Sequence, residues 1–193
     1  MLGSVVSVLG EVSDFEAVLR EFGCSKLTVS GSGVFSARVV KLALYHTVLL
    51  YTEEAISRTA TFRSVRGTRR FILPTTVGRM TCGGLVSAPG IIITHGGGQV
   101  VKDVVSGPCE VKMILISDDL LSTHLKVMAK SDRHLPKRTS LWKPSPGPLA
   151  ELTMLYQSAI KLSVSKQQES YGKDSYRGLE QQIIDALIAC LQS

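Results

Sequence analysis

The chain has 193 residues and a formal net charge of +6; 44% of its residues are hydrophobic and 20% are charged. This is the composition of a folded domain and excludes an intrinsically disordered chain. The positive charge permits an acidic partner but is not gathered into the basic tails typical of nucleic-acid binding. No stretch reaches the roughly 18 apolar residues that a membrane-spanning helix needs. Four scattered cysteines without a CxxC motif indicate reduced thiols, and hence a cytoplasmic protein.

The N-terminal segment is mildly apolar, but it lacks a basic start and is interrupted by Gly3 and Gly10, so it is not a signal peptide. A helix of about ten residues is predicted to follow it. Ser13 and Glu16 have the spacing of a capping box, in which the two side chains bind backbone amides at the helix start. Apolar residues then recur at helical spacing up to Gly23, which suits the left-handed conformation that ends a helix.

A series of short strands is predicted between residues 26 and 117. Runs of β-branched and aliphatic residues alternate there with turns rich in Gly, Pro, Asp and Ser. These runs lie at 26–30, 34–44, 46–52, 58–64, 71–77, 78–84, 91–94, 99–105 and 111–116. Eight or nine strands with no helix between them predict a barrel or a sandwich of two packed sheets.

The C-terminal third is predicted to be helical. The spacing of apolar residues changes from strand to helix at Ser117-Asp118-Asp119, and these three residues are good N-caps. A basic linker with prolines follows at 131–148, and a second amphipathic helix at 149–164. Residues 165–178 are polar and predict a loop, after which a last helix covers 178–192. The apolar stripe of this last helix must be covered by the barrel or by another chain.

No catalytic motif stands out. The segment His95-Gly96-Gly97-Gly98 resembles an esterase oxyanion loop, but the sequence has no GxSxG nucleophile elbow, which favours a glycine turn between strands. The four histidines form no HxH or HExxH pair, so we predict neither a metal site nor a cofactor. A Ser/His/Asp or a Cys/His arrangement stays open, because the partners of such a site converge only in space. One arginine cluster predicts either a solvated face or a wall that holds an anion: Arg58, Arg63, Arg66, Arg69 and Arg70.

Taken in order, several segments resemble the N-terminal, effector-binding half of AraC/XylS-family transcription regulators. The segments that carry the resemblance are Phe71-Ile72-Leu73-Pro74, Gly78-Arg79, Gly83-Gly84, Ser87-Ala88-Pro89-Gly90, residues 109–116, Leu120-Leu121 and residues 179–187. The resemblance spans nearly the whole chain. It implies a mainly β fold with C-terminal α: a cupin-like, jelly-roll β-barrel or sandwich preceded by a short helix and followed by about three helices.

The same resemblance implies a ligand-sensing and dimerisation domain. Such a domain binds a small organic effector, which is a carboxylic acid for several family members, and transmits the effect of binding to a DNA-binding domain. Residues 1–117 are then the short helix and ligand-binding barrel, and residues 118–193 a helical linker and dimerisation region packed on the barrel as one structural unit. The helix-turn-helix domain that binds DNA is expected to be absent from this chain. The expected partners are the effector and a second copy in a homodimer, with no membrane.

A barrel of this size can hold one small ligand among the inward-facing side chains of its middle strands. The predicted ligand-binding residues are Arg38, Tyr45, Tyr51, Phe71, Leu73, Met80, Cys82 and His95. An inward arginine would pair with an effector carboxylate, with Arg38 as first candidate and Arg70 as second. The predicted dimer interface lies on the helices at 149–164 and 178–192 and consists of Leu152, Tyr156, Ile183, Leu187 and Leu191.

Two other functions stay open at this stage. A metal-dependent cupin-type enzyme, such as an isomerase or dioxygenase, requires a metal or a convergent acid and base. A protein–protein interaction domain without a ligand requires a tightly packed barrel interior.

Overall fold

The computed structural model describes residues 3–75, 77–129, 135–165 and 173–193. In chain order the elements are β1 (Gly3–Leu9), α1 (Val12–Arg20), β2 (Cys24–Val29), β3 (Ala37–Ala43), β4 (Thr47–Glu54), β5 (Arg58–Arg63), β6 (Thr68–Leu73), β7 (Arg79–Cys82), β8 (Leu85–Val86), β9 (Ile92–His95), β10 (Val100–Ser106), β11 (Cys109–Ser117), α2 (Asp118–Ala129), β12 (Ser140–Trp142), α3 (Pro146–Val164) and α4 (Lys173–Gln192). No helix in these ranges is long and apolar enough to cross a membrane.

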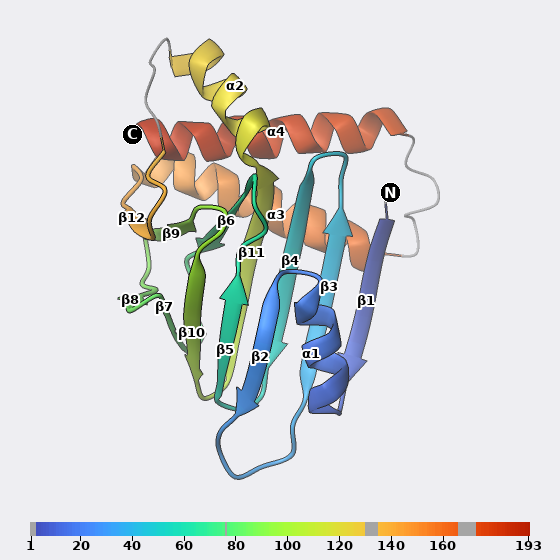
Figure 1. The fold of residues 1–193 in the computed structure, drawn as a ribbon. Helices are drawn as coiled ribbons and strands as arrows, with labels where there is room; N and C mark the ends of the chain where they lie inside the picture. The colour runs from blue at the N-terminus through green and yellow to red at the C-terminus, as the bar shows by residue number, and fades with distance from the viewer. Residues whose placement is uncertain (1–2, 76, 130–134, 166–172) are drawn as a thin grey trace.

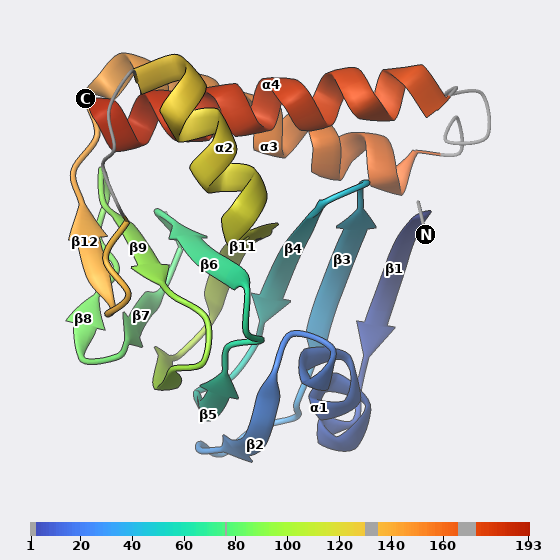
Figure 2. The same cartoon turned by 45° about the horizontal axis from the view of Figure 1, so that its top comes forward.

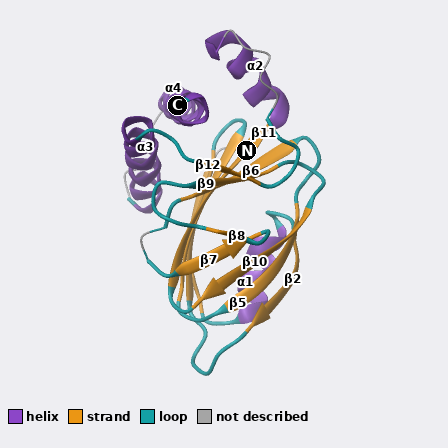
Figure 3. Ribbon diagram, turned by 90° about the vertical axis from the view of Figure 1, so that its left-hand side faces the viewer, coloured by secondary structure: helices purple, strands orange, loops and turns teal. Residues whose placement is uncertain are grey.

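Two antiparallel sheets face each other in a sandwich (Figures 1 and 3). The larger sheet has seven strands in the order β1-β3-β4-β11-β6-β9-β12, and the smaller has five in the order β2-β5-β10-β7-β8. Helices α3 and α4 run side by side along the larger sheet, with α2 next to α4 (Figure 2). Helix α1 instead closes the sandwich beside β2. The predicted fold class, mainly β with C-terminal helices, is confirmed.

The central strands of the larger sheet are buried on both faces, so alternate residues of one strand enter two different cores. In β11, Val111 and Met113 pack between the two sheets, whereas Ile114 and Ile116 pack against the helices. A strand covered on both sides has no need of polar residues at every second position. This explains the continuous apolar run at residues 113–116 of β11.

The predicted boundaries of two helices are partly confirmed. Gly23 has a φ of 89°, and a Cβ atom there would lie 2.3 Å from the carbonyl oxygen of Arg63, so this turn after α1 requires glycine. Helix α2 begins at Asp118 as predicted, and the Ser117 hydroxyl accepts a hydrogen bond from the Leu120 amide at 3.5 Å.

The predicted capping box is wrong. Helix α1 begins at Val12 with Glu11 as its N-cap, and no side-chain hydrogen bond caps it. Ser13 therefore lies inside the first turn instead of in front of it, because the chain enters the helix two residues after β1 ends.

Three strands were not predicted, and one of them is the two-residue strand β8. Strand β1 precedes the first helix, and β12 lies within the predicted linker, where it pairs with β9 and so joins the C-terminal part of the chain to the larger sheet. Helix α4 begins at Lys173, so the end of the predicted loop is helical. Residues 166–172 of that loop and residues 131–134 of the predicted linker lie outside the described part of the chain.

Candidate functional site

The structure divides the predicted ligand-binding residues among three regions. Those that lie between the sheets are Met80, Cys82 and His95, with Arg70 beside them. Those that lie on the helix side of the larger sheet are Arg38, Tyr51, Phe71 and Leu73. Tyr45 lies in the turn between β3 and β4 and lines a small pocket of about 290 Å³ against α4. The eight residues therefore do not form one site.

The inward orientation predicted for Arg38, Tyr51, Phe71 and Leu73 is wrong. Phe71 belongs to the core beneath the helices, while its neighbour Ile72 packs between the sheets. A shift of one residue moves a side chain to the other face of a strand. Because both faces of this sheet are buried, its apolar pattern does not show which face points inward.

A pocket of about 550 Å³ lies between α3 and the outer face of the larger sheet, and we call it the α3 pocket. Its lining residues are Arg38, Val40, Tyr51, Glu53, Glu110, Lys112, Tyr156, Gln157, Ile160, Lys161 and Val164. The floor consists of two rows of strand-paired residues, Arg38-Glu53-Glu110 and Val40-Tyr51-Lys112. These rows bring together residues from β3, β4 and β11, and the larger sheet thus positions every polar group of the floor.

The floor of the α3 pocket carries two ion pairs. Arg38 Nη1 lies 3.7 Å from Glu53 Oε2, and Lys112 Nζ lies 3.4 Å from Glu110 Oε2. The Tyr51 hydroxyl donates a hydrogen bond to Glu53 Oε1 at 2.7 Å. Burial, together with this hydrogen bond, raises the pKa of Tyr51 above its ordinary value, so the hydroxyl stays a donor.

The α3 side of the pocket adds a third basic residue and an apolar wall. Three basic and two acidic residues line the pocket, which leaves one positive charge, and Lys161 is the most exposed of the basic residues. Ile160 and Val164 provide apolar surface next to it. The buried Tyr156 hydroxyl donates a hydrogen bond to the Leu50 carbonyl at 2.6 Å and so fixes α3 on β4. The arrangement suits a molecule with one anionic group and an apolar body.

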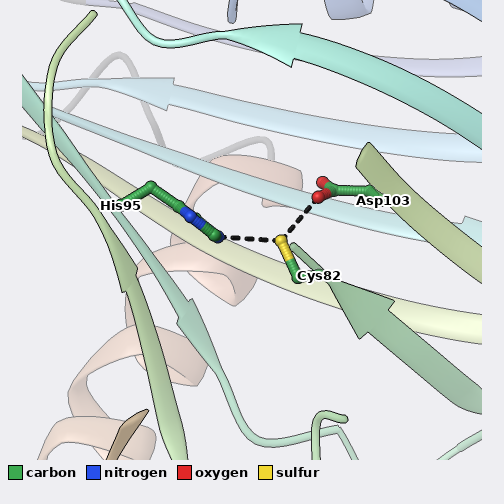
Figure 4. A group of neighbouring side chains, drawn as sticks. All are labelled: Cys82, His95 and Asp103. Atoms are coloured by element: carbon green, nitrogen blue, oxygen red, sulfur yellow. Dashed lines mark hydrogen bonds between the residues drawn. The ribbon is translucent and has the colours of Figure 1, made fainter. Parts of the chain in front are cut away.

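A second polar group lies between the sheets and consists of Arg70, Cys82, His95 and Asp103, which we call the interior cluster; Figure 4 shows the last three of these residues. Arg70 Nη1 and Nη2 donate to the two carboxylate oxygens of Asp103 at 3.0 and 3.2 Å. Cys82 Sγ lies 2.8 Å from His95 Nε2, and the Cys82 thiol also donates to Asp103 Oδ1. Cys82, His95 and Asp103 have no exposed surface.

The surroundings keep the side chains of this cluster in defined protonation states. Arg70 lies 4.4 Å from the centroid of the Phe62 ring, and His95 Nδ1 lies 2.8 Å from Thr139 Oγ1. Burial, with a smaller effect of Arg70, lowers the pKa of His95 to about 3, so the imidazole is neutral. Burial and the neighbouring carboxylate raise the pKa of Cys82, which keeps it a thiol. The thiol, imidazole and carboxylate are a donor set that could hold a metal ion.

The arginine cluster of the sequence is only partly a solvated face. Arg63 and Arg66 are exposed. Arg58, Arg69 and Arg70 are buried, and each is paired with a carboxylate. The solvated-face interpretation is therefore wrong for three of the five arginines.

The residues predicted for the dimer interface lie in the core of the single chain. Leu152, Tyr156, Ile183, Leu187 and Leu191 are at most 2% exposed and belong to the core between the larger sheet and the helices. The apolar stripe of the last helix was expected to be covered by the barrel or by another chain. In the structure it is covered by the larger sheet and the neighbouring helices. An interface at these five residues is thus contradicted by the fold.

Sequence reasoning missed six polar residues of the two sites: Glu53, Glu110, Lys112, Gln157, Lys161 and Asp103. Lys112 and Asp103 are charged residues inside largely apolar strands, which is a usable signal because a buried charge needs a partner. Glu53 and Glu110 come together only through the pairing of β4 with β11, which no local pattern shows.

The fold is thus a two-sheet antiparallel sandwich with a layer of helices on its larger sheet. This chain is similar in structure to the AraC-like transcriptional activator CuxR, with a TM-score of 0.70 and 10% sequence identity over 99% of this chain and 70% of that chain. At this identity the similarity establishes a shared fold.

Two further solved structures align less well. ToxT from Vibrio cholerae aligns with a TM-score of 0.40 and 13% identity over 71% of this chain and 54% of that chain. The cupin domain of Cnp3 from Schizosaccharomyces pombe aligns with a TM-score of 0.35 and 9% identity over 50% of this chain and 73% of that chain. Neither score is high enough to carry an argument. No protein-family model and no curated protein matches the sequence.

Proposed function

We propose that this chain is the ligand-sensing domain of a transcription regulator and that it binds a small organic anion in the α3 pocket. The observation that carries the proposal is the pocket itself, with its excess positive charge beside an apolar wall. The fold shared with an AraC-like activator supports the regulatory role. The effector site thus moves from the sandwich interior, where it was predicted, to the helix side of the larger sheet.

The position of the pocket suits the relay of a signal. Helix α3 forms one wall of the pocket and packs along α4, so a ligand wedged between α3 and the sheet acts on both helices. Such a ligand shifts the regulator between two states only as far as it binds one of them more tightly. A DNA-binding domain connected to these helices would receive the change.

Substitution of the basic residues tests the site. In a thermal-shift screen of small carboxylic acids, a bound acid is expected to raise the melting temperature of the wild-type chain. Arg38→Ala and Lys161→Ala should each remove a charge-assisted contact of about 1.5–3 kcal/mol, which weakens binding roughly 10- to 150-fold. Arg20→Ala is the control, because Arg20 also forms an exposed ion pair, with Glu16 on α1. A shift that survives both pocket substitutions would place the ligand elsewhere.

The homodimer, if it does not use α3 and α4, needs another surface, and the edge strand β1 provides one. Val5, Val6 and Val8 are 57%, 42% and 75% exposed, and β1 forms one edge of the larger sheet. An uncharged apolar edge strand of seven residues is a template for pairing with another strand. Proteins commonly protect such edges with charged residues or proline, and β1 has neither.

A second copy of this chain is the partner that β1 fits best. The chain carries a net charge of +6, so two copies repel each other over most of their surfaces. The residues Gly3–Leu9 contain no charged side chain, and two copies can therefore approach along β1. Antiparallel pairing about a twofold axis at Val6 joins the two larger sheets into one.

Val6→Lys is expected to give a monomer. This change places two like charges opposite each other at the twofold axis, without affecting the core. Val86→Lys is the control, because Val86 is 43% exposed and lies on the edge strand β8 of the other sheet. Light scattering should show a dimer for the wild type and the control. A dimer that persists in Val6→Lys, or a wild-type monomer, contradicts the β1 interface.

The cupin-type enzyme is less well supported than the sensor. The donor set that could hold a metal, Cys82, His95 and Asp103, has no exposed surface. A catalytic metal keeps one position open to substrate, whereas a structural one is closed.

A further inference from the structure

We propose that Cys82, His95 and Asp103 form a structural metal site for a zinc-type ion, which joins the two sheets of the sandwich. The three residues come from three strands: Cys82 ends β7, His95 ends β9 and Asp103 lies in β10. Cys82 and Asp103 are paired neighbours in the smaller sheet, and His95 belongs to the larger sheet. One ligand atom from each lies within 4.8 Å of the other two (Figure 4). An ion there would bind both sheets at once.

The donor set selects the class of metal. A thiolate, an imidazole nitrogen and a carboxylate oxygen are ligands of zinc and related transition metals, whereas magnesium and calcium prefer oxygen ligands alone. Three protein ligands leave the fourth position of a tetrahedral ion to a water molecule, and the structural role rests on the full burial of the three ligands, which closes that position to a substrate.

The neighbours of His95 resemble the outer shell of a metal-bound histidine. Thr139 Oγ1 lies 2.8 Å from Nδ1 and is itself 3.4 Å from the side-chain oxygen of Gln99. A hydrogen bond on one ring nitrogen fixes the ring and directs the other nitrogen, here Nε2, toward the metal. Nε2 already faces Cys82 Sγ at 2.8 Å.

Binding of a divalent ion adds one positive charge to the interior cluster. It forms a metal–sulfur bond and releases the single thiol proton of Cys82 to solvent, so the two charges of the ion are met by one new thiolate and by the Asp103 carboxylate, which already pairs with Arg70. Arg70 donates to both oxygens of that carboxylate, its Nη2 also lies 3.4 Å from Cys82 Sγ, and Phe62 faces its guanidinium at 4.4 Å. Ligating carboxylates are commonly held in this way.

This inference is independent of the effector site. The interior cluster lies between the sheets, whereas the α3 pocket lies on the opposite face of the larger sheet. A regulator can sense an anion in the pocket whether or not a metal stabilises its sandwich.

The test is refolding of the chain with cobalt(II), followed by absorption spectroscopy and metal analysis. The wild type is expected to retain about one cobalt per chain, to show a thiolate-to-cobalt charge-transfer band, and to melt at a lower temperature when refolded with a chelator. Cys82→Ser should lose the band, while Cys109→Ser should keep it, because Cys109 is a buried cysteine of the same core that lies outside the cluster.

Two results would overturn the proposal. One is a wild-type chain that refolds to the same melting temperature with and without cobalt and shows no charge-transfer band. The other is a band that persists in Cys82→Ser. If Cys82→Ser does not fold, the wild-type spectrum and the chelator comparison still decide the question, since neither uses the variant.

Discussion

Leu187→Asp is expected to prevent the chain from folding, rather than to separate a folded dimer into monomers. Leu187 has no exposed surface and packs in the core between α4 and the larger sheet. Truncation of such a leucine to alanine costs about 2–5 kcal/mol, and a carboxylate in its place adds the cost of burying a charge. Marginal domains have about 5–15 kcal/mol of stability in total. Circular dichroism and thermal melting measure the effect.

Gln182→Asp on the exposed face of the same helix is the matched control, and it should melt within a few degrees of the wild type. The opposite result, a Leu187→Asp chain that stays folded but changes from dimer to monomer, would restore the interface predicted from the sequence. The experiment therefore decides whether the apolar stripe of α4 serves the single chain or the dimer.

Glu54→Gln is expected to destabilise the chain by about 3–5 kcal/mol, because it leaves a buried arginine without its counter-charge. The side chains of Glu54 and Arg58 are each 1% exposed, and Arg58 Nε and Nη2 both donate to the Glu54 carboxylate. Thr52 Oγ1 donates to the same carboxylate at 2.8 Å. Urea unfolding at neutral pH measures the loss.

Glu53→Gln provides the comparison one residue away. Glu53 is paired with Arg38 at 3.7 Å, with both side chains more than 40% exposed, and such a pair contributes about 0–1 kcal/mol. Replacing both buried partners, as Glu54→Leu with Arg58→Met, should recover most of the stability lost in Glu54→Gln. Equal losses for Glu53→Gln and Glu54→Gln would show that burial does not set the strength of these pairs.

The order of strands and helices could be predicted from the sequence because turns leave local signals. Gly23 and Ser117-Asp118 mark real boundaries, since left-handed turns and helix starts restrict the residues that fit there. Strand β1 was missed because its valines are exposed on an edge, so it shows no alternation between buried and polar positions. Residues 140–142 were missed because a three-residue strand is too short to show a period.

The site could not be predicted because it depends on which face of each strand points between the two sheets and which face points toward the helices. Arg38 was expected to bind an anion inside the barrel, yet it lies on the helix side, because Ala37 and Val39 occupy the interior face of β3. The role proposed for Arg38, pairing with an effector anion, remains a prediction at this new position. Its ion-pair partner Glu53 lies on the next strand, β4, whereas Glu110 reaches the same floor from β11, which is far away in the sequence.

The central place of β11 in the larger sheet has a consequence for how the protein is made. Strand β4 pairs with β11, whose last residue is Ser117, although β4 itself ends at Glu54. Closing such a long stretch of chain is a slow step, because the loop entropy is lost before the pairing compensates for it. During synthesis, the edge of β4 that pairs with β11 stays unpaired until β11 has been made. The protein is therefore most prone to aggregation while only its N-terminal half has been synthesised.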